Sequence, residues 1–146
     1  MMKDTSTAME GEIEFDKVVI HYKSGWIFKG FTKDFSPDKD SFHYFFLPDK
    51  PSSDAEKVFI KDLKAVFFVR DLIGDPLYKE RKEYLEGEKP PGQKVEVTFE
   101  DGEVLVGSTL DYEPKRQGFF FTPADPKSNN IKVFTVTSAV KHVHFL

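Results

Sequence analysis

Four aromatic and basic side chains near the start of the sequence have the types and spacing of a binding site: Trp26, Lys29, Phe31 and Lys33. Rings beside cations can stack nucleic-acid bases while the cations meet phosphates. Trp and Phe outside a core equally mark interfaces, within a protein or with a partner. We favour packing or a protein contact, because residues 17–69 carry nine Lys against seven acidic residues, a small surplus. Single-stranded RNA or DNA recognition is the alternative hypothesis.

Metal and cofactor chemistry has little support in the sequence. His142 and His144 stand two apart in a predicted strand, so both rings would point to one face and could share a metal. No third ligand is identifiable, although His21 or His43 could approach in space, and surface histidines are the simpler interpretation. The absence of Cys removes thiolate ligands and disulfides. We expect neither a metal nor a cofactor.

Catalytic motifs are also missing. The sequence has no Gly-x-Ser-x-Gly elbow, no phosphate loop and no plausible order of triad residues. Asp34 and Asp111 each precede an aromatic residue and then a Pro, and a short acidic side chain there favours a turn stabiliser over a general base. We therefore name no catalytic residue and expect that the protein is not an enzyme.

An internal repeat must position these residues. The segment FEDGEVLVGSTLDYEP (99–114) has a near twin in YKSGWIFKGFTKDFSP (22–37). With an offset of 77 residues, eight of the 28 aligned positions from 17 to 44 are identical. After two small length changes the match resumes with KVF at 57–59 on KVF at 132–134, and with Ala65-Val66 on Ala139-Val140. We interpret the repeat as an internal duplication.

Each copy has the pattern of five short strands. Val95, Val97 and Phe99 alternate with polar residues, as in a strand with one wet face. A Gly after Ser or Asp predicts a hairpin turn, and a Gly inside a strand pattern indicates the bend that a small barrel needs. The structural turn and bend positions are Gly25, Gly30, Asp34, Gly102, Gly107 and Asp111. The sequence therefore predicts a mainly β protein of two tandem five-stranded SH3-like barrels.

The organisation along the chain follows from the repeat. Residues 1–16 form a flexible acidic leader, residues 17–69 the first barrel, residues 70–93 a linker and residues 94–146 the second barrel. In the linker, Asp75 before Pro76 is typical of a helix start, and LYKERKEYL could supply two turns before Gly87 and the Pro90-Pro91 pair. We expect a short helix there, and an irregular charged linker remains the alternative.

The segment VEVTFEDGEVLVGSTLDY resembles the first signature of Sm-like proteins, from Val95 to Tyr112 and less cleanly from Val18 to Phe35. It is also similar to a group of uncharacterised bacterial proteins that carry such units singly or in tandem. The resemblance implies the Sm-like barrel fold and a bacterial source. Sm-like RNA binders carry an Asn after the acidic turn and an Arg-Gly or Lys-Gly pair in late strands, and neither copy has them. The resemblance therefore implies the fold and not the RNA pocket.

Composition limits the remaining classes. The net charge is −4 and the apolar fraction 39%, and no run reaches the roughly 18 apolar residues of a membrane span. The N-terminal residues lack the apolar region of a secretory signal, so we expect a cytoplasmic protein without a membrane partner. We predict a non-catalytic interaction module for an unknown protein. A homo-oligomer is left open, because fused copies could imitate neighbours in a ring or pack face to face.

Overall fold

The protein is described by a computed structural model, which covers residues 15–46 and 55–146. Most of the predicted acidic leader lies outside the described residues. The described chain is mainly β, with ten strands and two one-turn 3₁₀ helices. They are β1 (Asp16–Tyr22), β2 (Ile27–Thr32), β3 (Ser41–Tyr44), β4 (Glu56–Phe59), η1 (Ile60–Asp62), β5 (Leu63–Val69), β6 (Gln93–Phe99), β7 (Val104–Thr109), β8 (Gly118–Pro123), β9 (Asn130–Val136), η2 (Thr137–Ala139) and β10 (Val140–Phe145). None of the described helices is long and apolar enough to cross a membrane.

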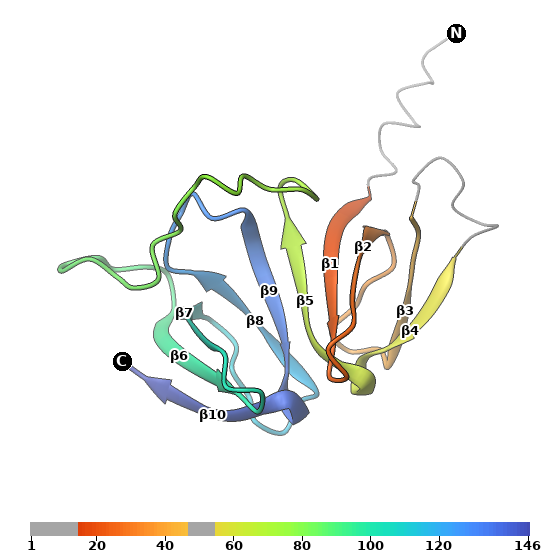
Figure 1. The fold of residues 1–146 in the computed structure, drawn as a ribbon. Coiled ribbons are helices and arrows are strands. Elements are labelled where there is room, and N and C mark those ends of the chain that lie inside the picture. Colours follow the sequence, from red (N-terminus) through yellow and green to blue (C-terminus); the bar gives the residue numbers. More distant parts are fainter. Residues whose placement is uncertain (1–14, 47–54) are drawn as a thin grey trace, which may run out of the picture.

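Eight strands form one antiparallel sheet in the order β10-β6-β7-β8-β9-β5-β1-β2, and β3 and β4 form a second sheet (Figure 1). A bridge between Phe31 and Phe45 joins β2 to the end of β3. The expectation of two separate closed barrels is therefore wrong, since the large sheet is open and runs through both halves of the chain. We call β1 to β5 the N-terminal half, β6 to β10 the C-terminal half, and residues 70–92 the connector.

The physical reason for the continuous sheet is β5, which pairs with β1 on one side and with β9 on the other. All seven residues of β5 are buried. Val66 and Phe68 belong to the core of the N-terminal half, which β9 completes with Phe134 and Val136. The alternate residues of β5, such as Phe67, belong to the core of the C-terminal half. One strand therefore serves both cores, as alternating side chains in a two-faced strand can do.

The elements of the two halves recur at a constant spacing. The strands β1, β2, β3 and β5 and the helix η1 start at residues 16, 27, 41, 63 and 60, and β6, β7, β8, β10 and η2 start 77 residues later. We call residues 77 positions apart counterparts. Phe59 ends β4 before η1, and Val136 ends β9 before η2, so these two are counterparts. The predicted match of the two KVF segments is therefore wrong by two residues, because identical letters occupy different positions in the strands.

Two of the predicted glycines show how tightly the strands approach each other. Gly102 lies in the turn between β6 and β7 with a φ of 96°, a value that favours glycine. Gly107 lies within β7, where a Cβ atom would collide with the backbone oxygen of Thr122 and the ring of Phe121 on β8. Gly25 and Gly30 occupy the counterpart positions in the β1–β2 turn and in β2.

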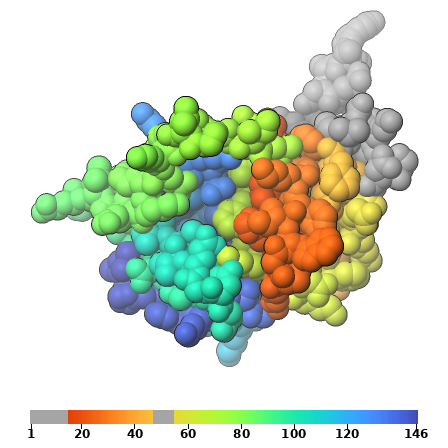
Figure 2. Space-filling view, in the orientation of Figure 1, coloured from red at the N-terminus to blue at the C-terminus, as the bar shows by residue number. Residues whose placement is uncertain are grey.

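The connector contains no helix, so the predicted linker helix is wrong. Its polar groups bind the C-terminal half instead of pairing along a helix. The Tyr78 hydroxyl and the Arg81 backbone N–H both donate to Asp125 Oδ2, at 2.6 and 2.8 Å. The hydroxyl of Ser128 donates to Glu80 at 2.8 Å. Figure 2 shows the connector in green across the upper side of the molecule, above the two halves.

Candidate binding groove

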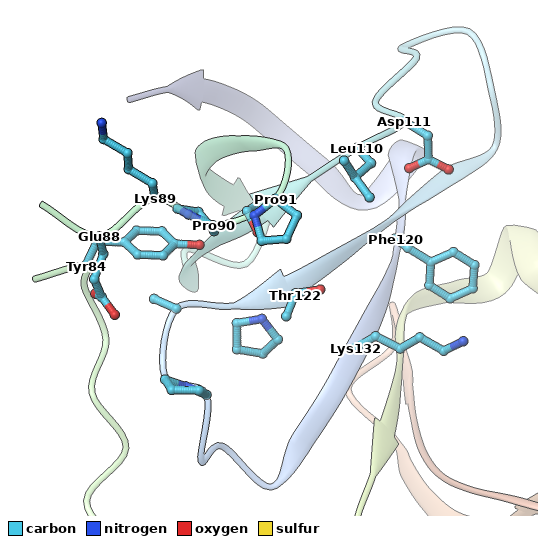
Figure 3. Close-up of a pocket in the computed structure, with 14 residues that line it drawn as sticks. Tyr84, Glu88, Lys89, Pro90, Pro91, Leu110, Asp111, Phe120, Thr122 and Lys132 are labelled. Atoms are coloured by element: carbon cyan, nitrogen blue, oxygen red, sulfur yellow. The ribbon is translucent and has the colours of Figure 1, made fainter.

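A groove of about 590 Å³ lies between the connector and strands β7, β8 and β9 (Figure 3). Its floor is the outer face of the sheet. Phe119 and Phe121 point into the core of the C-terminal half, so Phe120 and Thr122, which alternate with them on β8, face the other way. The exposed Leu110, just beyond β7, adds a further apolar side chain to the lining. The floor therefore offers Leu110 and the ring of Phe120, which is partly buried against the core of the N-terminal half.

The connector forms the opposite wall of the groove, with Tyr84, Pro90 and Pro91. This wall is fixed by charge pairs. Arg81 binds both carboxylate oxygens of Glu88, at 2.7 and 3.2 Å, and the Arg81 hydrogen bond lowers the pKa of Glu88. A pair of prolines has few backbone conformations to lose on binding, so this wall is rigid before any ligand arrives.

Lys132 supplies a cation at the far end of the groove (Figure 3). Its Nζ atom lies 4.7 Å from the ring centre of Phe120 and 5.0 Å from that of Phe68. Within the described residues no carboxylate forms a salt bridge with Lys132. The ammonium group is thus held over two rings and is available to an anionic group of a ligand.

The structure does not bring the four predicted binding residues into this groove or into one site. Lys29 and Phe31 share one face of β2, and Lys33 follows the strand with its Nζ atom 5.6 Å from the ring of Phe15. Trp26 lies in the β1–β2 turn, is 66% exposed, and stacks on Phe28, which faces the N-terminal core. Three of the four residues therefore lie at one face of β2 and its end, and Trp26 lies apart.

The two predicted turn aspartates have different surroundings. Asp34 accepts hydrogen bonds from the backbone N–H of His43 at 2.9 Å and from Thr32 Oγ1, and its Oδ2 lies 2.8 Å from His43 Nδ1. Burial raises its pKa, but the hydrogen bonds from His43 and Thr32 outweigh burial, and the pKa is lowered. Asp111 instead lines the groove, and Phe120 occupies the counterpart position of His43. The sequence pattern predicted the same role for both aspartates. In the structure Asp34 stabilises its turn, whereas Asp111 lines the groove.

The strongly perturbed acid of the described chain is Asp125. Hydrogen bonds from Tyr78 and from the backbone of Arg81 lower its pKa to about 2. This carboxylate is occupied in holding the connector. Among the described residues no group of three His, Asp or Glu side chains is placed to hold a metal ion, and His142 and His144 are both exposed on β10.

Comparison with known proteins gives one match. A model described as a family of unknown function (DUF6982) matches residues 14–146. The chain belongs to this family. No curated protein matches the chain, and no solved structure matches it. The function of this DUF6982 member is therefore inferred from the geometry of its own residues.

Most of the groove residues were not predicted from the sequence. Tyr84, Pro90 and Pro91 stand in a segment that we interpreted as a helix followed by a two-proline stop. Phe120 and Lys132 belong to segments that we interpreted as strands of the second copy. One signal was available, because the C-terminal copy has Ser108 and Thr122 where the N-terminal copy has Phe31 and Phe45. Small residues on one copy of a repeated face indicate a hollow.

Proposed function

We propose that this DUF6982 chain is a non-catalytic interaction module that binds an extended segment of a partner protein in the groove. The observation that carries the proposal is the lining of the groove, which combines aromatic and aliphatic side chains on the floor, a rigid proline wall and two lysines, Lys89 and Lys132. Grooves with apolar walls and few polar groups fix the orientation of extended peptides. Lys132 favours an acidic residue at one end of that segment, beside the ring of Phe120.

The charged groups of the protein support a binding role over catalysis. A general base works best with a pKa near the operating pH. Asp125 has a pKa near 2 and is engaged by Tyr78 and Arg81. Lys64 is held by Asp101 and Glu103, and although burial opposes its charge, their hydrogen bonds raise its pKa. These groups stabilise the fold and are poorly suited to exchange protons with a substrate.

The same proposal includes the ancestry of the fold, a duplicated Sm-like (SH3-like) small barrel in a cytoplasmic bacterial protein. Two observations support it: the 77-residue spacing of the elements, and the equal strand orders β5-β1-β2 and β10-β6-β7 within the large sheet. The absence of Cys fits a reducing compartment. The Sm-like resemblance of residues 95–112 supports the bacterial source and the barrel origin.

The experiment is selection from a displayed library of random peptides, followed by titration of one selected peptide against purified variants. We expect the selected peptides to contain apolar and acidic residues. The substitutions Leu110→Asp and Lys132→Glu should each weaken binding at least about tenfold, a loss of roughly 1.4 kcal/mol. Trp26→Ala, on an exposed aromatic outside the groove, is the matched control and should bind normally. Failure to select any peptide, or equal binding by all variants, would overturn the proposal.

Single-stranded nucleic acid is the second candidate ligand, favoured by the arrangement of Lys29, Phe31 and Lys33 along one face of β2 and its end. Phosphate contacts weaken as salt rises, so labelled oligonucleotides should bind at low salt and dissociate as salt increases. Lys29→Ala and Lys33→Ala should each reduce the salt dependence, whereas Lys132→Ala should not. Absence of binding at low salt removes this candidate.

A further inference from the structure

The contact between the two halves is head-to-tail. It pairs β5, the last strand of the N-terminal half, with β9, the fourth strand of the C-terminal half. The two surfaces that meet are therefore different, and each has a counterpart elsewhere in the molecule. The counterpart of β5 is β10, and the counterpart of β9 is β4. Within the described chain, β10 pairs only with β6, and β4 only with β3. The molecule therefore has a second copy of each contact surface, one on β10 and one on β4, and within the described chain these two surfaces do not pair with each other.

We propose that a second copy of this chain docks by pairing its β4 with β10 of the first, in the register of β5 and β9. The internal register pairs Ala65 with Thr135, Val66 with Phe134 and Phe67 with Val133. Moving each residue to its counterpart pairs His142 with Val58, Val143 with Lys57 and His144 with Glu56. The contact goes beyond the peptide-binding function, since neither strand lines the groove.

The internal contact includes a lysine whose counterpart forms no salt bridge with any residue that the structure describes. Lys64, on β5, binds Asp101 at 2.7 Å and Glu103, and lies 4.7 Å from the ring centre of Phe99. The counterpart of Lys64 is Lys141, exposed on β10. The counterparts of Glu103 and Phe99 are Trp26 and Tyr22. In the head-to-tail dimer, the ammonium group of Lys141 therefore meets two aromatic rings, which hold cations well.

The charges along the two free strands are complementary at a further position. In the transferred register, His144 of one copy lies opposite Glu56 of the other, and both side chains are exposed. Their counterparts, Phe67 and Val133, are apolar and buried. The internal contact thus has an apolar pair at this position. At the free edges, His144 and Glu56 take its place and can form a hydrogen bond or an ion pair.

Exposed apolar residues gather at the same two edges. Phe59, next to η1, is 40% exposed, and its counterpart Val136 is 1% exposed in the internal contact. Phe145, at the end of β10, is 43% exposed, and its counterpart Phe68 is 3% exposed. The transferred contact buries apolar surface in the way that the internal contact already does. It explains why large apolar side chains remain at these positions.

The free-edge contact is weaker than the internal one and therefore reversible. Lys57 stands where the internal contact has Phe134, and His142 stands where it has Ala65, so less apolar surface is available. Charged residues on an edge strand also oppose indiscriminate pairing. Because the two docking surfaces differ, association adds copies in one direction, and it ends by closing a ring or continues as a chain.

Sedimentation velocity of the full chain over a wide concentration range tests the proposal. The average mass should rise above the 16.8 kDa of one chain as concentration increases. Trp26→Ala and Lys141→Ala should each weaken association several-fold, and the double variant should weaken it little beyond either single variant, because the two side chains meet each other. Lys127→Ala and Ile73→Ala, exposed residues away from both edges and outside the groove, are the matched controls.

A mixing experiment distinguishes this contact from any other dimer. One variant carries Lys141→Ala and His144→Ala on β10, and the other carries Trp26→Lys and Glu56→Lys on the β4 side, so the two altered edges do not attract each other. Each alone should remain a single chain, while a mixture should form a 1:1 dimer through the one intact pair of edges. A wild-type mass that stays at one chain up to millimolar concentration overturns the proposal. So does a dimer that the edge variants leave unchanged.

Discussion

The two halves of the molecule present the same sheet face in different ways. In the N-terminal half, the counterparts of the groove floor are Phe31 and Phe45, and Phe45 is buried beneath the ring of Phe15, with ring centres 5.8 Å apart. In the C-terminal half, Ser108 and Thr122 take those positions, and the connector stands off from them to form the groove. The difference shows that the same sheet face forms a groove in the copy with small side chains and is filled in the copy with two Phe rings.

The two halves also differ at their outer strands. In the internal contact, Phe134 of β9 completes the N-terminal core, whereas its counterpart Lys57 on β4 is exposed to solvent. The same position in the fold is thus apolar where a neighbouring strand covers it and charged where none does. The type of residue at this position therefore depends on whether a neighbouring strand covers it, and not on the strand to which it belongs.

The largest effect is expected at that pair of positions. Phe134→Ala removes a fully buried ring that contacts Phe35 and Phe120, and should lower the free energy of unfolding by roughly 3–5 kcal/mol. Lys57→Ala, at the exposed counterpart, should change it by less than about 0.5 kcal/mol. Urea denaturation of both variants provides the measurement. Equal losses would show that the two positions do not differ in burial as described.

A smaller effect should follow from making the C-terminal face resemble the N-terminal one. Thr122→Phe gives the groove floor the side chain that its counterpart, Phe45, has in the N-terminal half. The new ring fills the space that a peptide would occupy. A selected peptide should then bind at least about tenfold more weakly, or roughly 1.4 kcal/mol, as measured by calorimetric titration. Circular dichroism should show an unchanged fold, because Thr122 is exposed. Undiminished binding would place the peptide elsewhere.

The smallest effect concerns the connector, for which the described part of the N-terminal half shows no equivalent. Hydrogen bonds from Tyr78 and Arg81 lower the pKa of Asp125 to about 2, from an ordinary value near 3.8. A lowered carboxyl pKa adds stability above the ordinary pKa, and this stability is lost as pH falls through the folded value. The urea midpoint of the wild type should therefore drop between about pH 4 and pH 2. Tyr78→Phe should flatten this part of the profile, and an unchanged slope would count against the assignment.

The sequence predicts the strands well because their signals are local. The alternation of Val95, Val97 and Phe99 and the turn at Gly102 each involve neighbours in the chain, and the repeat fixes both copies at once. The pairing of β5 with β9 was not predictable, since edge-to-edge pairing of strands that are distant in sequence has no residue signature. The two KVF segments show the hazard, because identical letters suggested a register that strand pairing shifts by two residues.

The groove was hidden for a related reason. The connector has good helix formers around Tyr78 and Arg81, but their hydrogen bonds to Asp125 are tertiary and outweigh local propensity. Thr122 is smaller than its counterpart Phe45, but this difference creates a groove only because the connector lies over β8. The predicted binding residues Trp26, Lys29, Phe31 and Lys33 lie outside the groove, so the site that sequence reasoning favoured and the site that the structure offers are different surfaces.

The shared use of β5 and β9 also bears on the order in which the molecule can be made. The core of the N-terminal half requires Phe134 and Val136 on β9, which follow the rest of that core in the sequence by more than 60 residues. A nascent chain of this protein therefore carries an unfinished apolar surface until β9 has been synthesised. Its first half can reach its final form only after β9 has been translated, because without β9 the core lacks Phe134 and Val136.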